Sequence, residues 1–359
     1  MNTRLSSPGD AAVETQKLPE RIDAEEQLNE LLTRPKAALV QFIKSVASPL
    51  LILGAGGKMG PTLAVLAKRA AAAAQHPLEV VAVSRFSDRN VRVWLEAHRV
   101  KTIACDLLDA QAVRELPRAE ALLYLVGLKF GTAQDPAVTW AINTIVPARV
   151  LERYPRARVA ALSTGNVYPL AEVGEGGSLE TAPLTPRGEY ANAAVGRERI
   201  FEFCSRPHHT PVTLLRLFYA VELRYGVLVD IARKVHLGQR VELANGWFNC
   251  IWQGDANELA LRALGLAACP PSVWNLCRPE VFSVRAVASR LGELLGRPAQ
   301  FIGTEASTAL LGASGRLCAA LGTPSIPLDV MLRWTAHWVK QGGRNLAKPT
   351  HFEVRNGNY

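Results

Sequence analysis

Cysteine is scarce in this 359-residue chain, and its spacing excludes the usual cysteine-built sites. The six cysteines are scattered, with no Cys-x-x-Cys pair. This argues against a zinc ribbon and against a disulfide framework, and it favours reduced thiols in a cytoplasmic protein. The adjacent His208 and His209 lie between prolines and predict a surface loop, so we expect no metal.

Long hydrophobic runs are also absent. No apolar run reaches the roughly 18 residues that a membrane-spanning helix needs. Residues 1–16 are polar and lack the apolar core of a signal peptide. We therefore expect a cytoplasmic protein with no membrane partner. With 48% hydrophobic residues and 20% charged residues, the chain can bury a substantial core.

Positive charge is plentiful but not clustered. Lysine and arginine total 41 against 32 acidic residues, for a net charge of +9. No block of five or six basic residues occurs, which argues against a nucleic-acid partner. Only ten of the 41 basic residues are lysines, and the arginines that dominate are well suited to phosphate-bearing ligands.

Short apolar runs alternate with helical stretches through the first half of the chain. The expected strands are residues 50–53, 80–83, 102–104, 122–126 and 159–162. Continuous Val, Ile and Leu runs separated by helices are typical of a parallel sheet covered on both faces. The sequence therefore predicts an α/β fold with a Rossmann-type doubly wound parallel sheet and a smaller C-terminal substrate-binding region.

This pattern suggests four regions. We expect a helical leader at 1–48, which Pro35 divides into two short helices. A nucleotide-binding core at 49–220 follows. Residues 221–345 would mainly form the substrate-binding region, with segments returning to the core, and 346–359 would form a tail.

A glycine-rich turn, residues 54–60 (GAGGKMG), lies between the first strand and a helix expected at 61–74. Gly54 would allow the tight turn, Gly57 the approach of backbone to a pyrophosphate, and Gly60 close helix packing. The helix N-terminus favours phosphate charge. We therefore predict a dinucleotide site that includes Lys58 and Met59.

The end of the second strand discriminates between cofactors. It reads Ser84-Arg85, where NAD enzymes usually place an acidic residue for the ribose hydroxyls. A hydroxyl and a guanidinium suit the 2′-phosphate of NADP, so NADP is expected, with NAD still possible. Asp106, after the third strand, is either an adenine contact or a helix N-cap.

Five ordered segments carry a resemblance to the extended short-chain dehydrogenase/reductases, the NAD-dependent epimerase/dehydratase family. They are residues 143–148 (NTIVPA), 163–168 (STGNVY), 183–198, 216–219 (RLFY) and 251–255 (IWQGD). The likeness extends over most of residues 49–300. It implies a Rossmann fold, hydride chemistry with a bound nicotinamide and a homodimer formed through a two-helix face.

The resemblance also implies roles for single residues. Thr164 and Tyr190 would hydrogen-bond the reacting oxygen, and Asn143 would support the sheet and the active site. Asn166, in the same segment as Thr164, is an expected substrate contact. Arg224, after the substrate-side strand, would contact an anionic substrate such as a nucleotide-sugar diphosphate.

One departure from the family is the missing lysine of the Tyr-x-x-x-Lys pair, whose place is taken by Ala194. An isolated tyrosine has a pKa near 10, and a nearby cation lowers that pKa by stabilising the phenolate. Lys129, in a glycine-flanked loop after the fourth strand, is the first candidate replacement. Arg197 is the second, although arginine cannot shuttle protons.

Two functions from different classes follow. The first is an NAD(P)-dependent epimerase or reductase acting on a hydroxyl or ketone of a sugar-like small molecule, which includes nucleotide-sugars. The second is a catalytically inactive NADP-binding sensor or scaffold. Ala194 favours the second, and the retained Thr164, Tyr190 and Asn143 favour the first.

Overall fold

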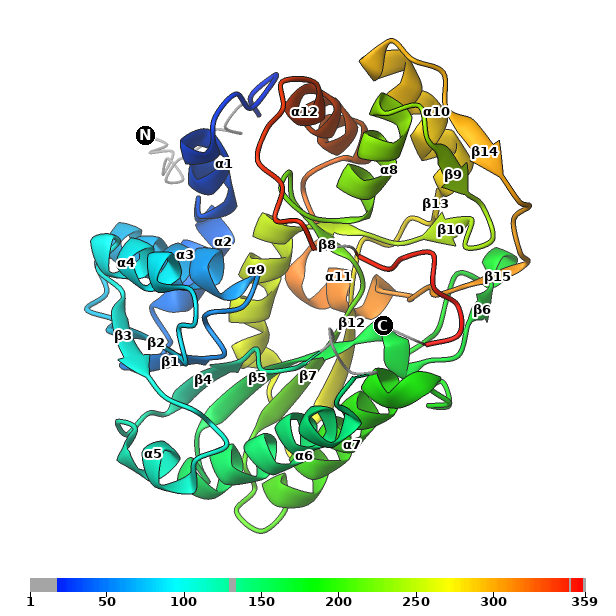
Figure 1. Cartoon of the computed structure of the whole chain (residues 1–359). Helices are drawn as coiled ribbons and strands as arrows, with labels where there is room; N and C mark the ends of the chain where they lie inside the picture. Colours follow the sequence, from blue (N-terminus) through cyan, green and yellow to red (C-terminus); the bar gives the residue numbers. More distant parts are fainter. Residues whose placement is uncertain (1–17, 129–133, 349, 358–359) are drawn as a thin grey trace, which may run out of the picture.

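A seven-stranded sheet, parallel throughout, forms the centre of the molecule (Figure 1). The computed structural model describes residues 18–128, 134–348 and 350–357. The strand order is β12-β7-β5-β4-β1-β2-β3. The strands are β1 (Leu50–Leu53), β2 (Val80–Ser84), β3 (Lys101–Ala104), β4 (Ala121–Tyr124), β5 (Arg158–Thr164), β7 (Val212–Leu217) and β12 (Ser272–Leu276).

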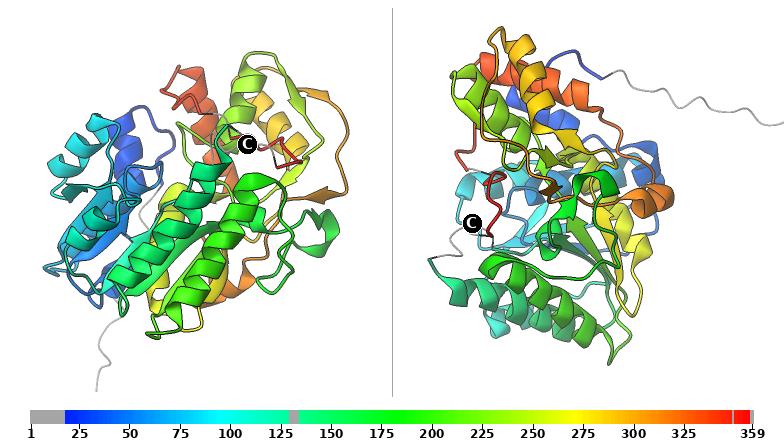
Figure 2. Two further views of the ribbon diagram at one scale, coloured as in Figure 1. Left: turned by 60° about the horizontal axis from the view of Figure 1, so that its bottom comes forward. Right: turned by 90° about the vertical axis from the view of Figure 1, so that its right-hand side faces the viewer.

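Helices cover both faces of this sheet. One face carries α5 (Ala110–Glu115), α6 (Pro136–Arg153) and α7 (Gly188–Ser205), and the other carries α3 (Gly60–Ala73), α4 (Arg89–Ala97) and α9 (Gln253–Arg262) (Figures 1 and 2). Side chains alternate between the two faces, as a strand requires. Leu50 and Ile52 belong to one hydrophobic core, whereas Leu51 and Leu53 belong to the other. The predicted doubly wound α/β fold is thus confirmed.

The C-terminal half builds a smaller lobe above the carboxyl ends of the strands (Figure 1). Its own hydrophobic core is formed chiefly by three helices that pack together, α8 (Val227–His236), α10 (Val284–Leu295) and α12 (Leu328–Lys340). Four short strands form two pairs beside them, β9 (Arg240–Glu242) with β14 (Gln300–Ile302) and β10 (Trp247–Phe248) with β13 (Phe282–Ser283).

Short elements connect this lobe to the sheet. Although β12 and α9 follow residue 221, they belong to the central layer. The remaining elements are β6 (Ala171–Glu172) paired with β15 (Thr308–Ala309), β8 (Ala220–Val221) paired with β11 (Ile251–Trp252), α11 (Gly315–Leu321), and the 3-10 turns η1 (Gly165–Val167), η2 (Val173–Glu175) and η3 (Ala263–Leu266).

The leader forms two helices, α1 (Glu25–Leu32) and α2 (Ala37–Ile43), separated at Pro35. α2 packs against α3 and α9, and its Leu39 and Ile43 lie in the core beneath the sheet helices. Leu28 of α1 instead joins the core of the lobe. The leader therefore packs on both parts of the molecule. Within the described residues, no helix combines the length and apolarity that crossing a membrane would demand.

Candidate active site

The glycine-rich turn between β1 and α3 has the geometry of a phosphate cradle. Gly54 has a φ of +83°, and a Cβ on Gly60 would lie 2.4 Å from the Ala55 carbonyl oxygen. Both positions therefore require glycine. Gly57 differs, because the nearest atom to its Cβ would be the loop's own Gly54 oxygen at 3.4 Å. The outer side of Gly57 is therefore open to a ligand. No side chain caps the N-terminus of α3, so the N–H groups of its first turn remain available for phosphate.

Of the residues predicted to contact the nucleotide ribose and adenine, Ser84 lies beside this turn. A Cβ on Gly56 would lie 2.5 Å from the Ser84 hydroxyl oxygen, so the end of β2 and the turn are in contact. Arg85 is exposed. Asp106 is also exposed, and its carboxylate accepts a hydrogen bond from the Leu108 N–H at 2.9 Å. Asp106 thus shapes the turn after β3, while Asp109 caps α5.

Thr164 and Tyr190 line one cavity of about 290 Å³ together with the glycine-rich turn. Thr164 ends β5, and its hydroxyl oxygen accepts hydrogen bonds from the N–H and the side-chain amide of Asn166, both at 3.2 Å. Tyr190 lies in the first turn of α7 and is 9% exposed. Gly57, Lys58, Met59, Gly60 and Asn166 line the same cavity. Residues more than 100 positions apart are therefore brought together.

Ala194 stands at the position where the family has a lysine, and it contributes apolar packing there. Ala194 is fully buried against Val167, Tyr168 and Phe218. Arg197, one turn further along α7, does not take over as a free cation. Its guanidinium donates to the Asn143 side-chain oxygen at 2.7 Å and to the Val126 carbonyl at 3.1 Å.

The contacts of Arg197 join α7 to α6 and to the segment after β4. Asn143 is fully buried and also donates to the Thr139 carbonyl at 2.8 Å. Asn143 is therefore a support for the site, held by Arg197, and it is not among the residues that line the cavity. Lys129, the first candidate replacement for the lysine, lies outside the described residues.

Lys58 is the lysine that lines the cavity in the described part of the chain. Its ammonium group donates to the Ala220 carbonyl at 2.5 Å and lies 4.5 Å from the centre of the Tyr225 ring. Burial lowers the pKa of Lys58 to about 8, despite the opposing effect of Glu222. Sequence reasoning placed Lys58 in the turn but missed these contacts, because Ala220 and Tyr225 follow it by more than 160 positions.

A buried ion pair links α7 to β7. Glu198 of α7 and Arg216 of β7 are each 4% exposed and lie 2.6 Å apart. Glu198 also accepts a hydrogen bond from the Ser163 hydroxyl at 2.5 Å, and Arg216 donates to the Tyr168 hydroxyl at 2.6 Å. This network fixes β5, α7 and β7 relative to one another.

Arg224 does not reach the cavity. Its guanidinium binds Glu222 and, at 3.1 Å, Glu25 of the leader helix, and it also donates to Asn29. Its N–H groups are thus engaged in holding α1 on the lobe. Tyr219 and Tyr225 line the cavity instead. Tyr219 belongs to the segment 216–219 that carries the family resemblance, but neither tyrosine was predicted to line the site. Among the described residues, no group of three or more His, Cys, Asp or Glu side chains is placed to hold a metal ion.

Comparison with known proteins identifies the family of the chain. The model of the NAD dependent epimerase/dehydratase family matches residues 50–265, which is more than half of the chain. The chain belongs to this family. A sequence search of curated proteins finds no match.

Solved structures of the epimerase/dehydratase type share its fold. UDP-glucose 4-epimerase from Thermotoga maritima, in a complex with UDP-glucose, is 18% identical, with a TM-score of 0.65, over 82% of this chain and 99% of that one. The UDP-Glc/GlcNAc 4-epimerase of Campylobacter jejuni is 21% identical, with a TM-score of 0.66, over 82% and 100%. The dTDP-glucose 4,6-dehydratase DesIV of Streptomyces venezuelae is 18% identical, with a TM-score of 0.66, over 82% and 97%. At these identities the likeness shows the fold.

Proposed function

We propose that this protein is an NAD(P)-dependent epimerase or reductase that acts on a hydroxyl or ketone of a sugar-like substrate, including nucleotide-sugars. The observation that carries the proposal is the convergence of Thr164 and Tyr190 with the open glycine-rich turn in one cavity. Hydride transfer to or from a carbonyl carbon needs a nicotinamide and polar groups on the reacting oxygen, and this cavity offers a place for both.

The glycine-rich turn and the N-terminus of α3 fit the pyrophosphate of the nucleotide, and bound NAD(P) would supply the hydride chemistry. The Thr164 hydroxyl and the Tyr190 phenol would hold the reacting oxygen, and Tyr190 would give or take its proton. Thr164 is oriented by the two hydrogen bonds from Asn166. Lys58 would supply positive charge in the cavity, where Ala194 supplies none.

NADP is the proposed cofactor. Ser84 lies against the glycine-rich turn, and exposed Arg85 follows it. An acidic residue at this place would repel a 2′-phosphate, whereas a hydroxyl and a guanidinium can bind one.

Nucleotide titration tests the proposal most directly. The purified full chain is titrated with NADPH and with NADH while nicotinamide fluorescence is followed. We expect tighter binding of NADPH. Tyr190→Phe is expected to keep this affinity and to lower turnover by roughly 10²- to 10⁴-fold, in an assay against a panel of nucleotide-sugars. Binding of neither nucleotide would refute the proposal.

Ala194 supports a second candidate, an inactive NADP-binding sensor or scaffold. Under this alternative the chain binds NADPH, while Tyr190→Phe leaves its biological activity unchanged. The intact Thr164–Asn166 arrangement, with Tyr190 in the same cavity, favours the enzyme.

We also propose that the protein is a cytoplasmic homodimer. α6 and α7 lie side by side on the outside of the sheet (Figure 2). They expose large apolar side chains, with Trp140 at 39%, Ile145 at 43% and Phe203 at 68% exposure. Exposed aromatic and aliphatic groups on neighbouring helices are typical of protein interfaces.

A further inference from the structure

Residues 350–357, the last segment that the structure describes, bind to the lobe through hydrogen bonds and an ion pair. We call this segment the C-terminal strap. Thr350 donates to the Asp230 carboxylate from its N–H at 3.1 Å and from its hydroxyl at 2.5 Å. The Asn245 side chain donates to the Phe352 carbonyl at 2.5 Å, and Glu353 pairs with Lys234. The strap is therefore an ordered part of the lobe that follows α12.

The strap ends against the beginning of the catalytic helix. A Cβ on Gly357 would lie 2.2 Å from the Arg187 carbonyl oxygen, and a Cβ on Gly188 would lie 2.2 Å from the Gly357 oxygen. Both glycines have positive φ values, +79° for Gly188 and +81° for Gly357. This close approach requires glycine on both sides. The strap thus spans from the lobe to the turn that leads into Tyr190.

Two arginines meet at this junction without a compensating carboxylate. Arg355 of the strap donates to the carbonyl and hydroxyl oxygens of Thr308, both at 2.7 Å, and to the Ala244 carbonyl at 3.1 Å. These neutral acceptors fix the position of the guanidinium but do not neutralise its positive charge. Burial and the nearby charge of Arg187 lower the pKa of Arg355. Within the described residues, neither guanidinium lies at ion-pair distance from a carboxylate.

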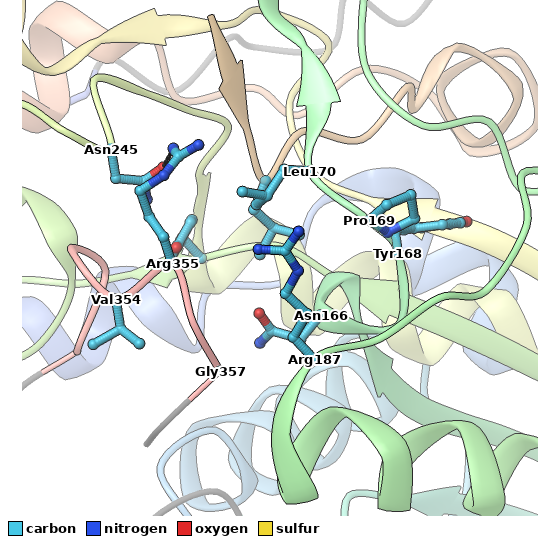
Figure 3. Close-up of a pocket in the computed structure, with 11 residues that line it drawn as sticks. Asn166, Tyr168, Pro169, Leu170, Arg187, Asn245, Val354, Arg355 and Gly357 are labelled. Atoms are coloured by element: carbon cyan, nitrogen blue, oxygen red, sulfur yellow. Dashed lines mark hydrogen bonds between the residues drawn. The ribbon is translucent and has the colours of Figure 1, made fainter. Parts of the chain in front are cut away.

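Arg187 and Arg355 line a small cavity together with Asn245 and Asn166 (Figure 3). Its volume of about 30 Å³ accommodates roughly two water-sized atoms, and hence two oxygens of one anionic group. Asn166, Tyr219 and Leu310 line both this cavity and the one that contains Thr164 and Tyr190. The two cavities therefore adjoin.

We propose that Arg187 and Arg355 form an anion subsite that receives a phosphate or carboxylate group of the substrate. The C-terminal strap completes the substrate site by carrying Arg355 to it. This inference rests on the proposed function, because it places the reacting oxygen at Thr164 and Tyr190. It also assigns the anionic contact to a pair of arginines from distant parts of the chain, in place of Arg224.

The test measures anion binding by the full chain saturated with NADPH, which blocks the nucleotide phosphate site. Calorimetric titration uses pyrophosphate as the phosphate probe, malonate as the carboxylate probe and glucose as a neutral probe. Arg355→Gln is expected to weaken binding of the preferred anion about tenfold or more, the size of losing a charged hydrogen bond. Arg355→Lys, which keeps the charge but loses the planar fork, should fall between.

Arg344→Gln is the matched control. It removes the same charge from the same end of the chain, but Arg344 binds Glu25 and does not line the cavity. Gly357→Val retains both arginines but should also weaken anion binding, because a side chain at residue 357 would displace the C-terminal strap from the start of α7. Thermal melts establish that each variant is folded.

Three outcomes would overturn the inference. They are the absence of pyrophosphate and malonate binding to the NADPH-loaded chain, equal anion affinity in Arg355→Gln and Arg344→Gln, or a loss of glucose binding as large as that of the anion. Failure of the proposed function would be visible separately, as failure of NADPH itself to bind.

Discussion

At the residue scale, Lys58 is the side chain whose chemistry depends most on its surroundings. On the surface a lysine stays charged at every physiological pH. Here burial lowers its pKa to about 8, so the cation is present below that pH and is lost as the pH rises through it. A charge that serves an anionic nucleotide would disappear over the same range.

We therefore expect NADPH affinity to fall as pH rises above about 8, which is the pKa of Lys58 in the protein without bound nucleotide. The measurement is the dissociation constant for NADPH from pH 6 to 10 at constant ionic strength. Lys58→Met should bind more weakly at pH 7 and lose the inflection. Lys68→Met is the control, because Lys68 donates to the Leu78 carbonyl outside the cavity. An inflection that persists in Lys58→Met would contradict the assignment.

Arginine at 197 illustrates how context decides a role that residue type leaves open. Its position in the sequence allowed it to replace the missing lysine. In the structure its N–H groups bind Asn143 and the Val126 carbonyl. The guanidinium therefore holds the segment after β4 to α7, and its charge is engaged there.

At the scale of elements, α7 is positioned by buried polar contacts. Glu198 and Arg216 are both almost fully buried, and charges in such places need a partner and hydrogen bonds. Ser163 and Tyr168 supply those hydrogen bonds. These contacts fix the end of β5, which carries Thr164, relative to the start of α7, which carries Tyr190.

Arg216→Met should destabilise the fold by about 3–5 kcal/mol, because Glu198 would be left buried without a counter-charge. Chemical denaturation followed by circular dichroism gives the free energy of unfolding. Adding Glu198→Gln should restore part of it by removing the lone charge. Arg206→Met is the surface control: its Glu202 pair is exposed, and the loss should stay under about 1 kcal/mol. Equal losses for Arg206→Met and Arg216→Met would refute the role of burial.

At the scale of the whole molecule, the face formed by α6 and α7 exposes large apolar side chains that no other described part of the chain covers. Phe203, the most exposed large apolar residue on it, is 68% exposed. Burying such groups against a second copy would remove apolar surface from water, which favours association.

Phe203→Glu should convert a dimer into a monomer, because a charge would be placed in a desolvated interface. Sedimentation velocity on the wild-type and variant chains gives the masses. Leu237→Glu is the matched control, since Leu237 is 57% exposed but follows α8 in the lobe. A monomeric wild type, or a dimeric Phe203→Glu chain, would rule out this face.

The central architecture could be read from local patterns. Apolar runs such as Leu50–Leu53, the glycine-rich turn and the helix after it are defined by neighbours in the chain, and β1 and α3 form where they were expected. The segments around Thr164 and Tyr190 were likewise recognisable, and the fold brings both to the carboxyl edge of the parallel sheet. The order of the strands, and the edge of the sheet at which these two residues lie, follow from the α/β topology that the alternation of strands and helices in the sequence already predicts.

The lobe's contribution to the site was decided by tertiary structure alone. The sequence favoured Arg224, which follows the substrate-side strand, and offered no signal for Arg355 in the tail. Folding commits Arg224 to Glu222 and Glu25, whereas it carries Arg355 beside Arg187. Sequence determines which charges the chain possesses and where helices and strands begin. Which charges are neutralised, and which face a cavity, depends on contacts between residues far apart in the chain, so only the folded molecule decides it.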